Sequence, residues 1–220
     1  PTGACYDRKE LAALAEVAVR RNVVVIADEI YEKLLYDGRT FTSIAAIGPE
    51  IAARTVVVNG MSKAFAMTGW RLGYAAGPKE IIDAMAKVQS HTTSHPASIS
   101  QVAGEVALRE AGEDVRRMAV EFERRRDAIV ALLAKQRGIT CVPPAGAFYV
   151  FPNVSGLFGR AISGRTVTCG QDLSEVLLET ARVAVVPGEA FGSRDHVRIS
   201  FSCERERIEE GLRRIGSAIA

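Results

Sequence analysis

The sequence predicts an α/β fold, in which part of a mainly parallel sheet with flanking helices is followed by a smaller α+β domain. Short apolar runs at Val23–Ala27, Thr55–Val58 and Leu72–Ala76 have the character of strands buried on both faces of a sheet. Segments with apolar residues at helical spacing alternate with these runs, which is typical of a sheet covered by helices. After Gly112 one long helical segment precedes shorter strands and helices, and this change of pattern predicts the second domain.

The first domain is expected over residues 1–112, as the C-terminal part of a large sheet domain. Its first helix is predicted at Asp7–Arg21, where leucine and alanine recur at helical spacing and Asp7 can cap the N-terminus. Further helices are predicted at Lys79–Gln89 and Ser98–Arg109. Because these helices alternate with the apolar runs, they can cover the faces of the sheet.

The second domain is expected over residues 113–220 and begins with a long amphipathic connector helix, Glu113–Arg137. Arginines on this helix are interleaved with acidic residues, so a solvated face is favoured over a nucleic-acid surface. The remaining predicted elements are strands at Thr140–Val142, Ala147–Phe151, Val183–Val186 and Val197–Phe201, a loop at Asn153–Gly170, and helices at Asp172–Arg182 and Glu204–Ile219.

The composition is that of an ordinary globular protein. The chain has 220 residues, is 48% hydrophobic and 25% charged, and carries a net charge of +2. This small charge gives no indication of a nucleic-acid or anionic-membrane partner. No apolar run approaches the ~20 residues that a membrane-spanning helix needs. The four cysteines are isolated, and the three histidines do not cluster with them, so no metal site or disulfide framework is expected. A reducing, cytoplasmic compartment is the default expectation.

The chain begins at Pro1 rather than at methionine, and no signal peptide is visible. We therefore expect it to be the C-terminal part of a longer protein. A processed N-terminus is the alternative.

The segment Val58–Tyr74, with the sequence VNGMSKAFAMTGWRLGY, concentrates the candidate chemistry. It places Lys63 just after an apolar run and Arg71 eight residues later, behind a Thr-Gly-Trp turn. Asp28 ends another apolar run, in VVVIADEIYE. Ligands of open α/β sheets collect at the carboxyl ends of the strands. A reactive amine, an anion-binding guanidinium and a buried carboxylate at such ends are what a pyridoxal phosphate enzyme needs.

Each of these side chains suits one part of that cofactor. Lys63 can hold it as an imine, and Asp28 can keep the pyridine nitrogen protonated through a charge-assisted bond. Arg71 can bind the phosphate bidentately, and Ser62 can add a hydroxyl donor. Tyr31 can donate to the phenolic oxygen. Taken singly, Asp28 and Ser62 could be turn residues and Tyr31 a packed aromatic.

Arg198 is a further candidate, because it lies in the alternating strand Val197–Phe201, far along the chain from the other groups. A guanidinium suits a planar carboxylate. The alternative is a strand-edge arginine that pairs with Glu189 or Glu204.

Several segments resemble the class I pyridoxal phosphate aminotransferases of fold type I, nearest to the bacterial aspartate/prephenate/aromatic group. They are PTGACY, VVVIADEIYE, VNGMSKAFAMTGWRLGYAAGP, PPAGAFYVF, VAVVPGEAFG and VRISFS. The resemblance extends over essentially the whole chain. It implies that Lys63 forms the Schiff base and moves the proton, and that Asp28 contacts the ring nitrogen. Tyr31 then contacts the phenolic oxygen, Arg71 the phosphate and Arg198 the substrate α-carboxylate.

The resemblance implies an enzyme of amino-acid metabolism, which transfers an amino group from an L-amino acid to a 2-oxo acid. The amino acid would be of the aspartate, glutamate or aromatic type, and the complete enzyme a cytoplasmic homodimer with no nucleic-acid or membrane partner.

Parts of the family pattern are absent from this sequence. The asparagine before the Pro-Thr-Gly motif, the phosphate-binding loop and the ring-stacking aromatic would all lie upstream of Pro1. The segment by itself is therefore expected to be inactive and to bind the cofactor weakly or not at all. The region Ser90–Gln101 carries no arginine for a second substrate carboxylate, so dicarboxylate recognition would have to come from elsewhere.

Two alternative functions remain open. The chain could belong to another fold type I enzyme, such as a β-lyase, because the residues around Lys63 do not separate these reactions. It could also be a non-catalytic, aminotransferase-like regulator domain. The presence of both Lys63 and Arg198, and of no basic DNA-binding segment, argues against the regulator.

Overall fold

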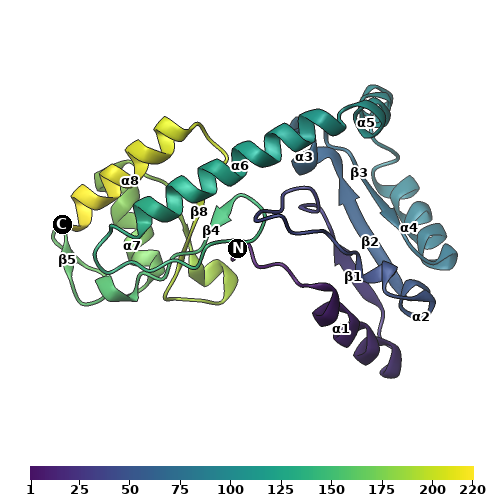
Figure 1. Ribbon diagram of the computed structural model, residues 1–220, viewed down its shortest axis with the longest axis horizontal. Helices are drawn as coiled ribbons and strands as arrows, with labels where there is room; N and C mark the ends of the chain where they lie inside the picture. The colour runs from purple at the N-terminus through teal and green to yellow at the C-terminus, as the bar shows by residue number, and fades with distance from the viewer. The chain divides into compact units, whose positions relative to one another are not determined.

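The computed structural model describes residues 1–220, which fold as two compact units. One unit is Cys5–Ala119, and the other is Val120–Ala220 together with Pro1–Ala4. The chain passes from one to the other within helix α6 (Gly112–Leu133), drawn in teal in Figure 1. The domain boundary expected at residue 112 stays a prediction for the domains of the intact protein.

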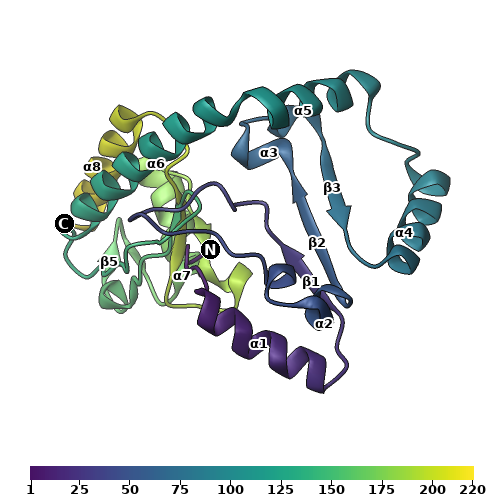
Figure 2. The same cartoon turned by 45° about the vertical axis from the view of Figure 1, so that its right-hand side comes forward.

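The Cys5–Ala119 unit contains a three-stranded sheet in the order β1-β2-β3 (Figures 1 and 2). Strands β1 (Val25–Asp28) and β2 (Thr55–Gly60) are parallel, and β3 (Gly73–Ala76) pairs with β2 in the antiparallel sense. The sheet lies among helices α1 (Arg8–Arg20), α2 (Pro49–Ala52), α4 (Lys79–Thr92) and α5 (Ser98–Glu110). The predicted α/β fold is confirmed. Strand β3 is antiparallel to β2 because the chain reverses direction after β2 and returns beside it.

Helix α1 begins where the sequence predicts. Asp7 accepts a hydrogen bond from the Glu10 backbone N–H at 2.8 Å, and the Asp7 N–H donates to the Glu10 carboxylate at 2.8 Å. This capping box satisfies two N–H groups that a helix start leaves open. Ala15 and Ala18 of α1 are buried against Ile44 and Ile51, which closes a small core on one side of the sheet.

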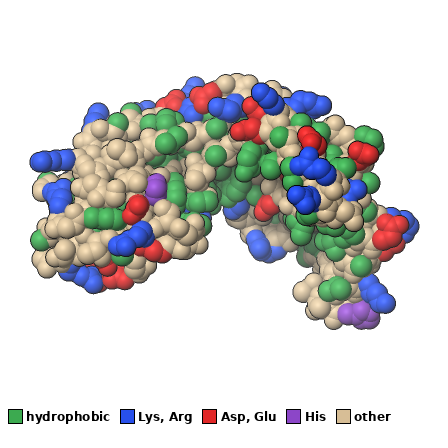
Figure 3. All heavy atoms as spheres, turned by 90° about the horizontal axis from the view of Figure 1, so that it is seen from below, with side chains coloured by type: hydrophobic (Ala, Val, Ile, Leu, Met, Phe, Trp, Pro, Cys, Tyr) green, Lys and Arg blue, Asp and Glu red, His purple; other side chains and the backbone are tan.

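The sheet is less buried than its apolar strands predict. Only β2 is buried at both of its ends, whereas alternate residues of β1 are exposed. Ile26 is 75% exposed, and Figure 3 shows hydrophobic side chains at the surface among the charged ones. The expectation of burial on both faces is therefore wrong for β1 and for β3, whose residues are exposed or half-buried. The physical reason is their position, because both are edge strands that pair only with β2.

The second unit is built on an antiparallel sheet in the order β4-β8-β7. These strands are β4 (Tyr149–Val150), β8 (Val197–Ser200) and β7 (Val186–Pro187). A hairpin of β5 (Ala161–Ile162) and β6 (Arg165–Thr166) precedes helix α7 (Gly170–Val176), which continues as a π-helical turn, Leu177–Ala181. The terminal helix α8 (Arg205–Ile219) buries the whole predicted stripe: Ile208, Leu212, Ile215 and Ile219.

Two predicted strands of this unit are wrong in extent. Thr140–Val142 forms only an isolated bridge between Thr140 and Asn153, and Val142 is 83% exposed. At Val183 the backbone N–H still donates to the Leu177 carbonyl at 3.1 Å. Val183 is therefore still bonded to the preceding helix, and β7 begins only at Val186.

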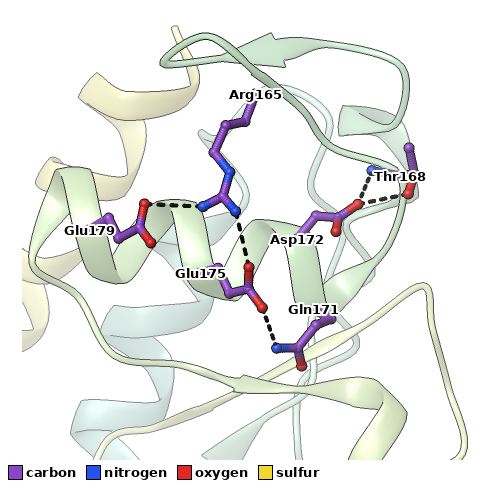
Figure 4. A network of polar contacts seen from close by, with 6 residues as sticks. All are labelled: Arg165, Thr168, Gln171, Asp172, Glu175 and Glu179. Carbon is purple, nitrogen blue, oxygen red and sulfur yellow. Dashed lines mark hydrogen bonds and ion pairs between the residues drawn. The ribbon is translucent and has the colours of Figure 1, made fainter.

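A polar network joins the β5–β6 hairpin to α7 (Figure 4). Arg165 donates to Glu175 at 3.2 Å and to Glu179 at 3.0 Å. Asp172 accepts hydrogen bonds from the Thr168 backbone at 2.8 Å and from its hydroxyl at 2.7 Å. These two bonds from Thr168 lower the pKa of the Asp172 carboxyl below its ordinary value. The Arg165 pairs join the hairpin to α7 and to the helical turn that follows it, and the Thr168 bonds hold the segment before α7 against its first turn.

No helix combines the length and the apolar character needed to cross a bilayer. None of the four cysteines forms a disulfide, and no group of histidine, cysteine, aspartate and glutamate side chains is arranged to hold a metal ion.

Candidate active site

Lys63 lies just beyond the end of β2, in the one-turn helix α3 (Met61–Ala64). The Phe65 N–H donates to the carbonyl of buried Met61 at 3.2 Å, which folds this segment back on the strand end. The lysine side chain is half-buried, and its Nζ lies 6.0 Å from the centroid of the Tyr31 ring. The amine and the phenol are thus neighbours although they come from different strand ends.

The parallel pairing of β1 and β2 explains why Tyr31 and Lys63 meet. Asp28 stands opposite Val58 in the register, and the Glu29 N–H donates to the Val58 carbonyl at 2.8 Å. Tyr31 follows in the turn after β1, and Lys63 follows β2. Because parallel strands end at the same edge of a sheet, both side chains emerge there.

Asp28 occupies this edge but is exposed, so the expectation of a buried carboxylate is wrong in this chain. Its Oδ1 accepts a hydrogen bond from the Ile30 N–H at 3.2 Å, which is the ordinary turn role considered for it. No other side-chain hydrogen bond or ion pair of Asp28 occurs in the structure, so its second oxygen is open to a donor. The exposure follows from the edge position of β1.

Ser62 and Arg71 are brought close by the ladder between β2 and β3. The Met61 N–H donates to the Leu72 carbonyl at 3.1 Å, so the next residues outward on the two segments are Ser62 and Arg71. Arg71 Nη1 donates to the Thr68 carbonyl at 2.8 Å, and its remaining N–H groups have no partner. The Ser62 hydroxyl is also unengaged. The pair offers spare donors to an anion.

The backbone of this connection is unusual. Ala66 and Arg71 both adopt left-handed conformations with φ of 53°. Such conformations cost non-glycine residues of order 1–3 kcal/mol and persist where the surroundings impose them. Gly60 is required for a different reason: a Cβ there would lie 2.9 Å from the Gly73 Cα and 2.9 Å from the Leu72 carbonyl oxygen. The conformation at the end of β2 therefore depends on left-handed residues and on the close approach of two backbone segments at Gly60.

Arg198 lies on β8, in the Val120–Ala220 unit. Its guanidinium carbon is 4.4 Å from the Tyr149 ring centroid and 4.8 Å from that of Phe191. The alternative of pairing with an acid is wrong: Glu189 accepts from the Gln171 N–H instead, and the ion pair of Glu204 is with Arg207.

The half-buried Arg198 guanidinium makes no hydrogen bond or ion pair at all. A partly desolvated cation with unused N–H donors is a binding group for a carboxylate or phosphate. Sequence reasoning missed Tyr149 and Phe191 as its neighbours. Their only signal was that the segments PPAGAFYVF and VAVVPGEAFG contain aromatic residues, which core packing explains equally well.

An amine, a carboxylate and a phenol thus lie at the ends of the parallel strands β1 and β2. The family model "Aminotransferase class I and II" matches residues 1–215, and the chain belongs to this family. The resemblance to the class I aminotransferases is thereby confirmed. Membership of the family implies pyridoxal phosphate as cofactor.

Curated relatives point to the same group. The chain is 47% identical over 216 residues to the aspartate aminotransferase of Geobacillus stearothermophilus, and 46% identical over 217 residues to the aspartate/prephenate aminotransferase of Cereibacter sphaeroides. These alignments cover 98% of this chain and 54% of each relative. The chain therefore spans about half the length of the curated relatives it matches.

Solved structures agree with the fold. The crystal structure of the Rhizobium meliloti aspartate aminotransferase matches with a TM-score of 0.96 and 44% identity, over 100% of this chain and 55% of that one. An aspartate aminotransferase from Thermus thermophilus, solved with maleate, matches with a TM-score of 0.88 and 42% identity, over 99% of this chain and 54% of that one.

Proposed function

We propose that the intact protein is a pyridoxal phosphate-dependent aminotransferase, which moves an amino group from an L-amino acid to a 2-oxo acid. The amino acid is of the aspartate, glutamate or aromatic type. Similar proteins are named aspartate, aspartate/prephenate and aromatic aminotransferases, and glutamate is included on the family resemblance. The observation that carries the proposal is the meeting of Lys63 and Tyr31 at the shared end of two parallel strands, with the Lys63 Nζ 6.0 Å from the ring.

The residues present fit the cofactor. Asp28 has a carboxylate oxygen without a protein partner for the ring nitrogen, and Tyr31 supplies a hydroxyl for the phenolic oxygen. Ser62 and Arg71 supply unengaged donors for the phosphate. Lys63 supplies the amine that holds the cofactor covalently. Each of the groups that the cofactor requires from this part of the protein thus has a matching side chain.

The chain's own side chains then have separate tasks. The bound cofactor supplies an electron sink that acidifies the substrate Cα. Lys63 takes the proton from Cα of the amino acid, and in the reverse direction it returns a proton to Cα of the product. Arg198 binds the α-carboxylate and fixes the orientation of the Cα–H bond. A guanidinium suits this task because it can form two parallel bonds to a carboxylate.

The resemblance alone supports two further proposals: the intact protein is a homodimer, and it acts in the cytoplasm. Maleate in the Thermus thermophilus structure is a dicarboxylate, which supports aspartate and glutamate as the first substrates to test.

The test uses the complete reading frame, purified with cofactor. Aspartate and 2-oxoglutarate are supplied, and glutamate formation is measured. Lys63→Ala is expected to remove the visible absorbance of the bound cofactor and to lower turnover by at least ~10³-fold, because proton transfer by a positioned base is worth about that much. Lys87→Ala, at an exposed lysine of α4, is the matched control.

Full activity of Lys63→Ala would contradict the assignment. Release of pyruvate or ammonia without glutamate would favour a β-lyase, and cofactor binding without turnover of any amino acid would favour the regulator. Residues 1–220 assayed alone are expected to bind the cofactor weakly or not at all. A stable visible band that Lys63→Ala removes would contradict that expectation.

A further inference from the structure

We propose that Tyr149 and Phe191 are positioning residues that orient the Arg198 guanidinium through their aromatic faces, so that its N–H donors point at the substrate carboxylate. This inference rests on the proposed function, since it explains how the carboxylate-binding arginine is kept ready. Tyr149, Phe191 and Arg198 all belong to the Val120–Ala220 unit.

The Arg198 guanidinium lies against two rings and makes no hydrogen bond or ion pair. It also has a charged neighbour, since burial and then the Arg198 charge lower the pKa of the Pro1 amine. Its central carbon lies 4.4 Å from the Tyr149 centroid and 4.8 Å from the Phe191 centroid, well within the ~6 Å range of a cation–π interaction. A free arginine side chain has many rotamers, and no hydrogen bond or ion pair restricts this one. Ring contacts restrict the rotamers while the N–H donors at the edge of the guanidinium plane stay available.

Sheet geometry places the first ring. Tyr149 of β4 stands directly opposite Ser200 of β8, and Arg198 lies two positions along β8. Side chains two positions apart on a strand share a face, so Tyr149 and Arg198 are diagonal neighbours on one face of the sheet. Diagonal neighbours lie within reach when one of them is aromatic or long. The contact is therefore set by strand register.

A separate set of contacts places the second ring. Phe191 ends the helical turn η5 (Gly188–Phe191), and the Phe151 ring meets it edge-to-face with the centroids 6.0 Å apart. Phe151 also stacks on His196 at 4.8 Å. Behind the turn, the Gly188 N–H donates to the His196 carbonyl at 2.9 Å. The Phe191 ring is thus held in place by Phe151, although part of the ring remains exposed to solvent.

Core packing does not explain this arrangement of the rings. Phe191 is 37% exposed, so its ring is not enclosed in the core. The ring instead covers a half-buried cation that would otherwise meet water. A ring with one side on Arg198 and another on Phe151 serves to hold the cation in place.

The experiment measures substrate binding in the complete, cofactor-loaded protein. Tyr149→Leu and Phe191→Leu are expected to raise the KM for aspartate and the Kd for maleate by about 5- to 30-fold each, as expected for a partly desolvated cation–π contact. The kcat at saturating aspartate and the cofactor absorbance should change much less. Tyr149→Phe keeps the ring and should restore most of the affinity lost in Tyr149→Leu. Phe158→Leu, at a half-buried aromatic outside these contacts, is the control.

A double-mutant cycle separates positioning from a general structural effect. In an Arg198→Ala background, Tyr149→Leu should have little further effect on maleate binding, because the ring then has nothing to orient. Equal losses in both backgrounds would overturn the proposal, and so would a KM within twofold of wild type in both leucine variants.

These results are distinct from a failure of the proposed function. If Arg198→Ala weakens maleate binding but the leucine variants do not, the aromatic positioning is wrong and the transaminase assignment stands. If Arg198→Ala leaves maleate binding unchanged, the carboxylate site itself is wrong. Melting temperatures measured alongside identify any variant that has failed to fold, and the tyrosine-to-phenylalanine rescue still tests the inference in that case.

Discussion

In the Cys5–Ala119 unit the backbone places the candidate groups, whereas in the other unit two side-chain rings hold Arg198. Arg71 is bound to the Thr68 carbonyl from a left-handed backbone position, and Lys63 follows directly from the end of β2. Arg198 has no such bond and lies against the rings of Tyr149 and Phe191. The difference teaches that one arginine is fixed by local sequence and the other by tertiary contacts.

Replacing each arginine by lysine tests this comparison, and these two variants should show the largest effects among those that test it. Lysine keeps the charge but loses the planar, bidentate geometry. Loss of a charge-assisted bond of ~1.5–3 kcal/mol predicts a weakening of roughly 10- to 150-fold. Arg71→Lys should weaken cofactor affinity, whereas Arg198→Lys should raise the KM for the amino acid and also lose the ring contacts. Cofactor titration and steady-state kinetics of the complete protein measure the two effects.

The comparison would be wrong if both variants changed the same quantity, either the cofactor affinity or the KM for the amino acid. A cofactor defect in Arg198→Lys, or an unchanged cofactor affinity in Arg71→Lys, would show that the assigned roles are wrong.

Two glycines test the comparison at the level of the backbone. A Cβ at Gly60 would lie 2.9 Å from the Gly73 Cα, and a Cβ at Gly188 would lie 2.2 Å from the Ser193 carbonyl oxygen. Overpacking of this kind typically costs ~1–3 kcal/mol, and the shorter distance predicts the larger loss for Gly188→Ala. Denaturant unfolding measures both variants. Gly48→Ala, where a Cβ meets no atom within 4 Å, is the control.

The glycine variants should also differ in function. Gly188→Ala shifts the turn that carries Phe191, so it should weaken substrate binding. Gly60→Ala should instead lower the affinity for the cofactor. An unchanged stability of Gly188→Ala would mean that the turn relaxes without loss, and the rigid support proposed for Phe191 would then be wrong.

The sequence predicted those parts of the molecule that depend on local pattern. The apolar runs located β1 and β2, the Asp7 cap located α1, and the apolar stripe of α8 was identified in full. The edge position of β1, which exposes Asp28, depends on which strands pair and has no local signal. The roles of Lys63, Tyr31, Ser62 and Arg71 stay predictions, although the structure groups these side chains around one strand end.

The aromatic neighbours of Arg198 could not be predicted for the same reason. Tyr149 reaches Arg198 only through the register of β4 against β8, and Phe191 only through a turn that closes on His196. A single sequence shows neither this strand register nor the closure of this turn. Aromatic side chains can be assigned to an arginine only when the distances between them are known.

A smaller effect is expected at the start of α1, which supports the sheet from one side. Asp7→Ala removes the capping box with Glu10, and loss of an N-cap typically costs ~1 kcal/mol of stability. Denaturant unfolding should show this loss with the activity of the complete protein unchanged, because the helix start is far in sequence from the site residues. Asp83→Ala, at an exposed ion pair with Lys79, should change stability less. Equal losses in the two variants would contradict the capping argument.

The smallest expected effect concerns α8, where Glu210 joins Arg213 and Arg214 at 2.7 Å each. Hydrogen bonds from these two arginines lower the pKa of Glu210 to about 2. Because the folded pKa lies below the unfolded value, the stabilising contribution is fully present above the unfolded pKa and is lost as the pH falls through the folded one. Glu210→Gln should therefore be less stable than wild type at neutral pH, with the difference shrinking steadily under acid conditions. Unfolding measured across this pH range, with Glu206→Gln as the exposed control, checks the sign, and a difference that grows on acidification would show that the arginines do not stabilise the carboxylate form.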